Sequence, residues 1–203
     1  MLIIPVYAGH TEKENNKSIV MDIEGKKATA TFGAGCFWCV EAVFERLEGV
    51  YEVVSGYSGG EVENPSYKEV CTGQTGHAEV CQIKFDPEKI SYGELLEVFW
   101  KTHDPTTLNR QGADIGPQYR SVIFYHNKEQ RKEAEYYKNK IDKSGYYTDP
   151  IVTEIVPFKI FYKADNYHQE YYELHGNQPY CTIVIKPKVE KVEKLFKDKM
   201  KHE

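Results

Sequence analysis

Two kinds of hydrophobic pattern divide the chain into expected strands and helices. Apolar and polar residues alternate at 27–33 and 78–85, and a period of two residues is typical of a β-strand. Residues 37–48 instead carry apolar side chains at helical spacing, which leaves Glu41 and Glu45 on the face expected to meet water. The pattern therefore predicts a strand that runs into a helix near residue 36.

The remaining expected elements give the order of the fold. Three more strands are predicted at 50–57, 120–125 and 151–156, and helices are predicted after Ser91 and over 128–141. The residues Ser-Tyr-Gly-Glu from Ser91 have the spacing of a capping box. The order strand–helix–strand–strand–helix–strand is the split βαβ or ferredoxin-like plan. We therefore expect an α+β fold with a ferredoxin-like βαββαβ core, whose helices cover one face of a mixed or antiparallel sheet.

Segments without periodicity surround this core. Residues 103–119 are rich in Asp, Asn, Arg and Gln, which hydrogen-bond their own backbone readily, so we expect an ordered and functional long loop. Residues 1–26 are a polar lead-in, and residues 188–203 predict an amphipathic C-terminal helix docked as an extension of the fold. A chain of 203 residues is most simply one domain, which we place at 27–187.

The charge and the length of the apolar runs exclude two classes of partner. A net charge of −5 gives no global positive field for nucleic acid. No apolar run approaches the roughly 20 residues of a membrane span, so no membrane association is expected. The apolar start of the chain is interrupted by Pro5 and has no basic residues before it, which favours a terminus over a signal peptide, although an upstream leader that was removed stays open.

The two cysteines at the predicted strand-to-helix turn are the main candidates for chemistry. Cys36 and Cys39 have the Cys-X-X-Cys spacing of disulfide oxidoreductases. Unpaired N–H groups and the dipole at a helix start favour an anion, so we expect the pKa of Cys36 to be lowered and its thiolate to form. The alternative is a pair of small residues buried beneath a helix. An odd number of cysteines, five, favours a reducing compartment such as the cytoplasm.

The other three cysteines are expected to differ in their roles. Cys71 and Cys81 fall in segments that look packed, so we expect both to be inert. Cys181 lies in a segment that looks flexible, so it could reach the site as a second reductant. A zinc site on Cys36, Cys39, Cys71, His77 and Cys81 is an alternative, but these residues contain no second Cys-X-X-Cys and no regular knuckle spacing. We therefore expect no bound metal.

Four other residues are unremarkable when each is taken alone. They are Tyr67, Glu79, Asp114 and Tyr119. Glu79 would be an exposed strand carboxylate and Tyr67 a core aromatic, unless the order of neighbouring segments gives a further reason.

That order resembles the peptide methionine sulfoxide reductase A family. The segments that carry the resemblance are Gly-Cys-Phe-Trp-Cys-Val-Glu at 35–41, Gly-Tyr-Ser-Gly-Gly at 56–60, Tyr-Lys-Glu-Val-Cys-Thr-Gly at 67–73, Gly-His-Ala-Glu at 76–79, Leu-Leu-Glu-Val-Phe-Trp at 95–100, His-Asp-Pro-Thr at 103–106, Asn-Arg-Gln-Gly-Ala-Asp-Ile-Gly at 109–116 and Gln-Tyr-Arg-Ser at 118–121. They are co-linear, which makes the match far more specific than one Cys-X-X-Cys motif. The resemblance implies an α/β roll around the βαββαβ core.

The resemblance also implies an activity, peptide-methionine (S)-S-oxide reductase, which repairs oxidised proteins. Cys36 would attack the sulfur of the S-epimer of methionine sulfoxide, free or in proteins, and Phe37 and Trp38 would cradle its methyl group. Glu79 matches the acid that protonates the sulfoxide oxygen, which requires burial to raise its pKa. The R-epimer would need a second, unrelated domain.

Three further residues match positions of the family site. Tyr67 and Tyr119 match hydroxyls that hold the sulfoxide oxygen, and Asp114 matches a residue that braces the site. The resemblance implies no cofactor, since the reductant is external, either thioredoxin or dithiothreitol. We expect the protein to be a monomer.

The second thiol departs from the commonest family pattern, in which Gly stands where this chain has Cys39. The resemblance implies that Cys36 becomes a sulfenic acid, which a second thiol converts to a disulfide that thioredoxin reduces. We favour Cys39 as the first resolving thiol because a short loop closes at least entropic cost. A bond within the first helical turn would require local unwinding, and Cys181 stays open as relay or substitute.

Two other classes of function stay open as alternatives to this one. A thioredoxin-type oxidoreductase would reduce insulin disulfides and ignore sulfoxides. A non-catalytic zinc or redox-sensing module would hold stoichiometric metal and show no turnover.

Overall fold

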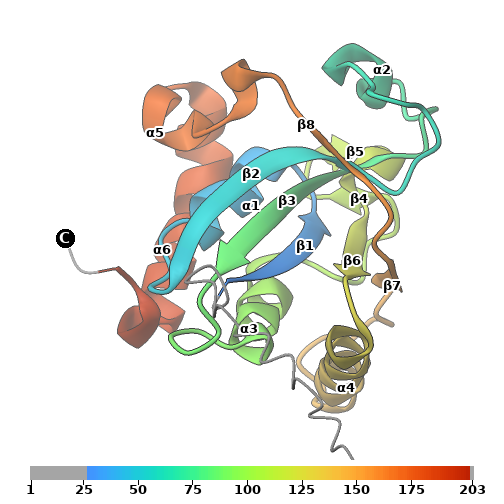
Figure 1. Cartoon of the computed structure of the whole chain (residues 1–203). Helices are drawn as coiled ribbons and strands as arrows, with labels where there is room; N and C mark the ends of the chain where they lie inside the picture. The colour runs from blue at the N-terminus through green and yellow to red at the C-terminus, as the bar shows by residue number, and fades with distance from the viewer. Residues whose placement is uncertain (1–26, 202–203) are drawn as a thin grey trace, which may run out of the picture.

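The computed structural model describes residues 27–201, and a six-stranded mixed sheet lies at its centre (Figure 1). Its order is β7-β6-β1-β3-β2-β8, and every neighbouring pair is antiparallel except the parallel pair β6 and β7. The strands are β1 (Ala28–Ala34), β2 (Val50–Ser58), β3 (Ala78–Phe85), β6 (Ser121–Tyr125), β7 (Glu154–Pro157) and β8 (Phe161–Lys163). The α+β class and the mixed sheet are therefore as expected.

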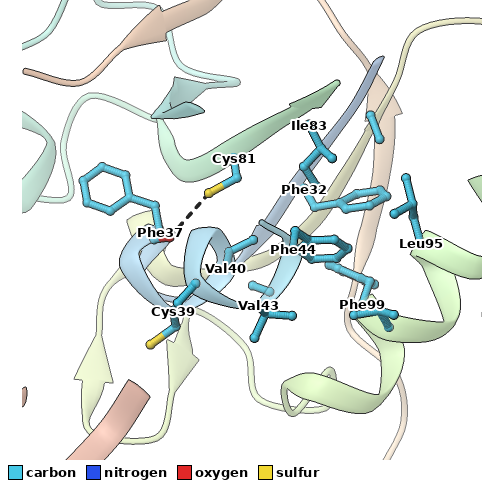
Figure 2. Close-up of a cluster of buried hydrophobic side chains, with 14 of the residues drawn as sticks. Phe32, Phe37, Cys39, Val40, Val43, Phe44, Cys81, Ile83, Leu95 and Phe99 are labelled. Atoms are coloured by element: carbon cyan, nitrogen blue, oxygen red, sulfur yellow. Dashed lines mark hydrogen bonds between the residues drawn. The ribbon is translucent and has the colours of Figure 1, made fainter. Parts of the chain in front are cut away.

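The helices of the core lie on one face of this sheet. Helix α1 (Phe37–Phe44) follows β1, and α3 (Tyr92–Thr102) connects β3 to the next part of the chain. Ser91 and Glu94 form the capping box that the sequence predicts. The ring of Phe32 in β1 lies 5.6 Å from Phe44 and 5.2 Å from Phe99 (Figure 2). Aromatic rings from one strand and both helices therefore close the main core.

The opposite face of the sheet carries a second, smaller cluster of buried side chains. A small buried cluster there includes Val80, Val122 and Phe124, and Phe158 and Phe161 pack against it. Strand β8 was not predicted, because three residues are too few to show a period.

The C-terminal part of the chain folds onto the helical face. It contains η2 (Asn166–His168), α5 (Tyr171–His175), the π-helical turn η3 (Cys181–Ile185), α6 (Lys186–Leu195) and η4 (Lys197–Lys199). Helix α6 packs against both α1 and α3 (Figure 1). Val189, Val192 and Phe196 are buried, so the apolar stripe of the predicted terminal helix faces the core.

The polar stretch 103–119 is ordered, as expected. It contains the short hairpin of β4 (Arg110–Gln111) and β5 (Asp114–Ile115), followed by η1 (Pro117–Tyr119). Gln111 binds the backbone of Asp104 twice, since its Oε1 accepts the N–H at 3.1 Å and its Nε2 donates to the carbonyl at 3.0 Å. The remaining helices are α2 (Tyr67–Cys71) and α4 (Lys128–Lys143).

The structure corrects three expectations about single residues. Glu41 is 1% exposed instead of facing water, because the segment around α5 covers the outer side of α1. Cys71 is exposed instead of packed, at the end of the short helix α2. Cys181 is buried in a helical turn, so the segment that holds it is not the flexible one expected.

The lead-in at 1–26, the start of the chain that was weighed as a signal peptide, and the last two residues of the expected tail lie outside the described residues. Within residues 27–201, no helix combines the length and the apolar character that crossing a membrane requires.

Candidate active site

Cys36 occupies the residue that joins strand β1 to helix α1. Gly35 before it has φ +93°, a left-handed conformation that favours glycine, and a Cβ there would overlap the side chain of Gln111. Cys36 itself is the N-cap of α1, with φ −57° and ψ 126°, and its carbonyl accepts the N–H of Cys39 at 3.0 Å. Its thiol makes no capping bond to the helix backbone. Cys36 therefore stands just outside the helix instead of in its first turn.

Glu79 is buried beside this turn. It lies on β3 opposite Tyr57 of β2, and its Oε2 accepts the backbone N–H of Phe37 at 3.0 Å. Burial raises the pKa of Glu79 to about 8, opposed by the bond from Phe37 and reinforced by the negative charge of Asp114. Its carboxyl therefore carries a proton near neutral pH and can donate it, as the sequence analysis expected.

The two buried thiols influence each other, and their surroundings favour the anion on Cys39 over the anion on Cys36. Burial, the hydrogen bond with Cys39 and the nearby charge of Glu79 raise the pKa of Cys36. The hydrogen bond from Cys36 lowers the pKa of Cys39 to about 7, against the effect of burial, and the positive charge of Lys188 lowers it further. The prediction of a lowered pKa at Cys36 is therefore wrong for the free enzyme. The main physical reason is burial of the Cys36 thiol, and the first N–H of the helix, at Phe37, points to Glu79 of β3 instead of to the thiol.

Lys188 was not predicted as part of the site. It lies on α6 and lines a small space that Cys39 and His103 also line. Nothing in the sequence distinguishes it from the other lysines of the tail, because only the packing of α6 on α1 brings it to the thiol.

An aromatic wall, defined here as Phe37, Trp38, Tyr67, His168 and Tyr171, stands beside the thiols. The Trp38 and Tyr171 rings are stacked at 3.7 Å with 7° between their planes. The ring of His168 lies 5.4 Å from Phe37, 5.7 Å from Trp38 and 4.5 Å from Tyr67. His168 and Tyr171 were not singled out from the sequence, and they lie at the end of η2 and the start of α5.

The aromatic wall contains buried polar atoms that have no hydrogen-bond partner among the described residues. Trp38 Nε1 and His168 Nδ1 are buried and make no hydrogen bond with any residue that the structure describes. The hydroxyl of Tyr57, which lies opposite Glu79 in the sheet, is also buried and has no hydrogen-bond partner among the described residues. Buried donors are normally bonded, so unpaired ones at a reactive thiol fit a site that is completed by a substrate or by water.

Tyr67 and Tyr119, from two other elements, lie near enough to Glu79 for its charge to affect their hydroxyls. Tyr67 starts α2 and Tyr119 ends η1. Burial raises the pKa of both hydroxyls, and the charge of Glu79 adds to the effect in each. Both therefore stay protonated and can donate a hydrogen bond to an oxygen placed near Glu79.

Asp114 is tied to the thiols through a tyrosine that the sequence analysis missed. The hydroxyl of Tyr180 donates to Asp114 Oδ2 at 2.8 Å and lies 3.9 Å from the sulfur of Cys39. The next residue is Cys181, whose thiol is buried, with its pKa raised by burial and by the nearby charge of Cys39. The structure thus brings Cys181 to the region of Cys39, with no hydrogen bond between the two thiols.

The remaining cysteines lie outside the Cys36–Cys39 pair. All five cysteines are free thiols. Cys81 donates to the carbonyl of Phe37 at 3.4 Å (Figure 2), and Cys71 is hydrogen-bonded to Tyr67. In the part of the chain that the structure describes, no three His, Cys, Asp or Glu residues are grouped so as to hold a metal ion.

The family model and the curated relatives that match this chain carry the same description. The family described as "Peptide methionine sulfoxide reductase" matches residues 28–200. The peptide methionine sulfoxide reductase MsrA of Sulfolobus acidocaldarius is 58% identical over 174 residues, which are 84% of this chain and 96% of that protein.

Solved structures agree with the sequence comparison. Reduced Mxr1 from Saccharomyces cerevisiae superposes with a TM-score of 0.71 at 36% identity, covering 81% of this chain and 94% of that one. Mxr1 in complex with Trx2 superposes with a TM-score of 0.51 at 28% identity, covering 76% and 91%.

Proposed function

The chain belongs to the peptide methionine sulfoxide reductase family and reduces methionine sulfoxide to methionine, and we propose that Cys36 is the nucleophile of this reaction. The observation that carries the proposal is the position of Glu79. Its protonated carboxyl is held by the N–H of Phe37, the residue directly after Cys36. A nucleophile and a proton donor thus meet at one helix start, which is what the reduction of an S–O bond requires.

The first step transfers the oxygen from the substrate to the enzyme. The Cys39 thiolate, hydrogen-bonded to Cys36, takes the Cys36 proton, and the Cys36 sulfur attacks the sulfur of the sulfoxide. Glu79 gives its proton to the oxygen, while the hydroxyls of Tyr67 and Tyr119 donate hydrogen bonds to it. The S–O bond of the substrate then breaks and the oxygen passes to the Cys36 sulfur as OH, while the S–S bond made in the attack breaks. Methionine leaves reduced by two electrons, and Cys36 is oxidised by two electrons to a sulfenic acid.

The wall explains which group of the substrate is recognised. Phe37 and Trp38 present aromatic faces next to Cys36, and such faces favour the apolar methyl of methionine sulfoxide. With the oxygen directed to Glu79 and the methyl to the wall, the sulfur attacked by Cys36 has only one handedness. This fixed arrangement supports a preference for the S-epimer, free or in a protein chain.

Cys39 then closes a disulfide with Cys36. Its sulfur attacks the sulfenic sulfur, the S–S bond forms and water leaves. Since Cys36 is the N-cap and not part of the helix, it has freedom to turn toward Cys39 without unwinding α1. The lowered pKa of Cys39 and the raised pKa of the buried Cys181 both support Cys39 as the first resolving thiol. Cys181 is then a relay or a substitute.

Thioredoxin is the reductant that we propose for this disulfide. The support is the Mxr1–Trx2 complex, in which a relative of this chain is bound to a thioredoxin. Two thioredoxin thiols lose two electrons and two protons, which restores the Cys36 and Cys39 thiols. Dithiothreitol would serve in its place, and no cofactor is required.

The remaining proposals concern the protein as a whole. The ferredoxin-like description of the core is supported by the order β6-β1-β3-β2, with α1 and α3 as the connecting helices. The hydrogen bond that Tyr180 donates to Asp114 supports a positioning role for Asp114. On the sequence arguments above, we propose a monomer that acts in the cytoplasm, with residues 27–187 as the catalytic domain and 188–203 as a C-terminal extension. The helix of this extension, α6, spans Lys186–Leu195 instead of the full range expected.

The test is turnover of a chromogenic methionine sulfoxide with thioredoxin, thioredoxin reductase and NADPH. The S-epimer should be consumed and the R-epimer ignored, and Cys36→Ser should lose all measurable activity. Cys71→Ser is the matched control, because it keeps a hydrogen-bonding group beside Tyr67 and should retain most activity. Reduction of insulin disulfides without sulfoxide turnover would replace the proposal with a thioredoxin-type function.

Mass spectrometry of the oxidised protein separates the two resolving thiols. After one turnover without reductant, we expect a Cys36–Cys39 disulfide. A Cys36–Cys181 disulfide as the first product would transfer the resolving role to the tail.

A further inference from the structure

Glu41 is a buried acid to which the proposed reaction gives no task. It lies on α1 after Cys39, is 1% exposed, and has one carboxyl oxygen with no hydrogen-bond partner among residues 27–201. Burying a carboxyl is costly, and burial raises the pKa of Glu41 to about 7. Side-chain packing alone does not explain a carboxyl that is buried at this position with one oxygen unbonded.

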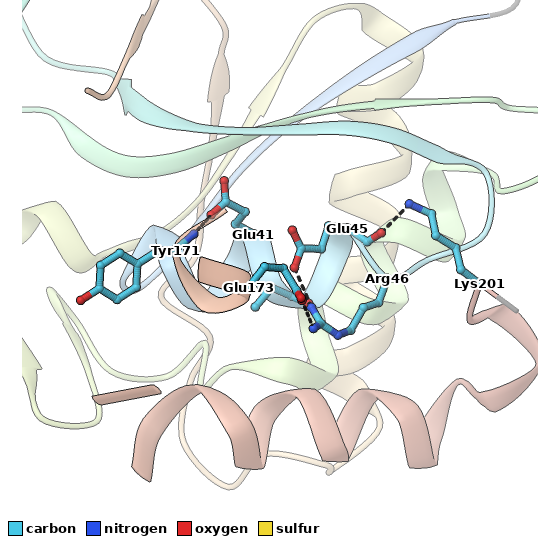
Figure 3. A network of polar contacts seen from close by, with 7 residues as sticks. Glu41, Glu45, Arg46, Tyr171, Glu173 and Lys201 are labelled. Carbon is cyan, nitrogen blue, oxygen red and sulfur yellow. Dashed lines mark hydrogen bonds and ion pairs between the residues drawn. The ribbon is translucent and has the colours of Figure 1, made fainter. Parts of the chain in front are cut away.

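Its other oxygen holds the backbone of the segment that carries the aromatic wall. Glu41 Oε2 accepts the N–H of Tyr171 at 3.3 Å (Figure 3). The backbone N–H of Glu170 is also hydrogen-bonded to the carboxyl. Glu170 has φ +51°, a left-handed conformation that costs energy for a residue other than glycine. The carboxyl thus binds the backbone where that backbone is strained, and helps to keep it there.

The contact closes a ring of interactions with the wall. Tyr171 stacks on Trp38 at 3.7 Å, and Trp38 and Glu41 lie one turn apart on the same helix. The backbone of residue 171 is therefore bound to the same helix that its ring covers. Gln169 fixes the other side of the segment, since it bonds both the N–H and the carbonyl of Ser55 at 3.0 Å.

The interactions around Glu41 leave no other charged partner for it. Glu45 on α1 is bonded to Arg46, and Arg46 is also ion-paired with Glu173 of α5 (Figure 3). Cys81 of β3 lies near enough for the charge of Glu41 to raise its pKa. The backbone N–H groups at 170 and 171, together with the side chain of Ser55, are thus the groups that the carboxyl binds.

We propose that Glu41 is a positioning residue for methionine sulfoxide binding, which keeps Tyr171 stacked on Trp38 and thereby holds the substrate-facing ring in place beside Cys36. This inference rests on the proposed function of Cys36 and its wall. It predicts a defect in substrate binding and in the state of Trp38, while the thiols and Glu79 keep their chemistry.

The main experiment compares Glu41→Ala with wild type in steady-state kinetics. We expect KM for the sulfoxide to rise about tenfold, the effect of losing roughly 1.4 kcal/mol of binding, with kcat changed less than threefold. Glu41→Gln keeps an acceptor oxygen for the Tyr171 N–H and should restore most of the wild-type KM. Glu48→Ala is the matched control, a glutamate just after the same helix that pairs with Lys89 at 3.0 Å, and it should leave KM unchanged.

A second readout follows Trp38 directly. In a Trp100→Phe background, Trp38 is the only tryptophan, and Glu41→Ala should change its fluorescence because the Tyr171 ring no longer stacks on it. Tyr171→Ala should raise KM to a similar extent, and adding Glu41→Ala to it should raise KM no further. This loss of additivity distinguishes action through Tyr171 from a general loss of packing.

The outcomes separate this inference from the proposed function. An unchanged KM and unchanged Trp38 fluorescence in folded Glu41→Ala, or fully additive effects with Tyr171→Ala, would overturn the role of Glu41 alone. If Glu41→Ala does not fold, Glu41→Asp, whose shorter side chain withdraws the carboxyl, must give the same rise in KM. Activity that survives in Cys36→Ser would instead overturn the proposed function.

Discussion

Two of the three histidines that are buried within residues 27–201, His103 and His168, lie in regions where buried polar groups are bonded in opposite ways. Below α3, His103 has both ring nitrogens bonded, with Nδ1 2.7 Å from the carbonyl of Phe99 and Nε2 2.8 Å from the hydroxyl of Ser121. In the aromatic wall, His168 Nδ1 has no bond with any residue in 27–201. Burial lowers the pKa of both rings, to about 4 for His103.

The difference shows which buried polar groups serve the fold and which serve the site. Ser121 continues the bonded chain to Thr153 at 2.7 Å, so the first region is complete without a ligand. In the second region, the buried polar atoms gain hydrogen-bond partners only when a substrate or water binds there. A buried histidine alone would not reveal this, and the partners of its two nitrogens do.

The largest expected effect that sharpens this comparison is at Glu79. Glu79→Ala should lower kcat/KM about 10²- to 10⁴-fold, because general acid catalysis contributes on this scale. Since the acid form is required and its pKa is about 8, wild-type kcat/KM should fall as the pH rises through 8. It should also rise through about 7 as Cys39 ionises, and the upper limb should vanish in Glu79→Ala. A profile that is flat from pH 7 to pH 9 in wild type would contradict the assigned roles.

The two histidines themselves should respond in opposite ways to loss of the ring. His168→Ala should raise KM about tenfold with a small effect on the melting temperature, since each aromatic contact contributes roughly 0.5–1.5 kcal/mol. His103→Ala should leave Ser121 unbonded and destabilise the fold by about 2 kcal/mol or more, with KM near wild type. Chemical denaturation and kinetics on both variants give the test, and equal profiles would remove the distinction.

The smallest expected effect is at Lys188. Lys188→Met removes the positive charge beside Cys39, so the pKa of Cys39 should move up from about 7 toward the ordinary value for a thiol. Alkylation of Cys39 at pH 7 should slow a few-fold, and resolution of the sulfenic acid should slow with it. Lys194→Met, on the same helix, is the control and should alkylate like wild type.

Local pattern predicted the regular elements well and the short ones poorly. The strand predicted at 78–85 is β3 to the residue, and the capping box at Ser91 starts α3. The helix predicted at 37–48 ends at Phe44, and α2 and β8 were not expected. A segment of three to five residues is too short to express a period, so tertiary contacts decide its conformation.

The residues of the site also differ in whether a local sequence pattern could identify them. Cys36 and Cys39 could be found from their own spacing, because the strand-to-helix turn is local. Glu79, Tyr67 and Tyr119 come from three separate elements, and only resemblance to a family, not their own sequence context, singled them out. Tyr180, His168 and Lys188 carry no local signal at all, so the fold had to bring them in.

The sequence by itself determined the order of the elements, the position of the thiol pair at a helix start and the family of the chain, because these depend on neighbours along the backbone. The tertiary structure alone decided which thiol carries the charge and which acids are buried. Glu41 looked like a residue for water because one face of α1 was apolar, yet the tail covers its other face. Charge and burial depend on what packs from distant parts of the chain, and no local pattern records that.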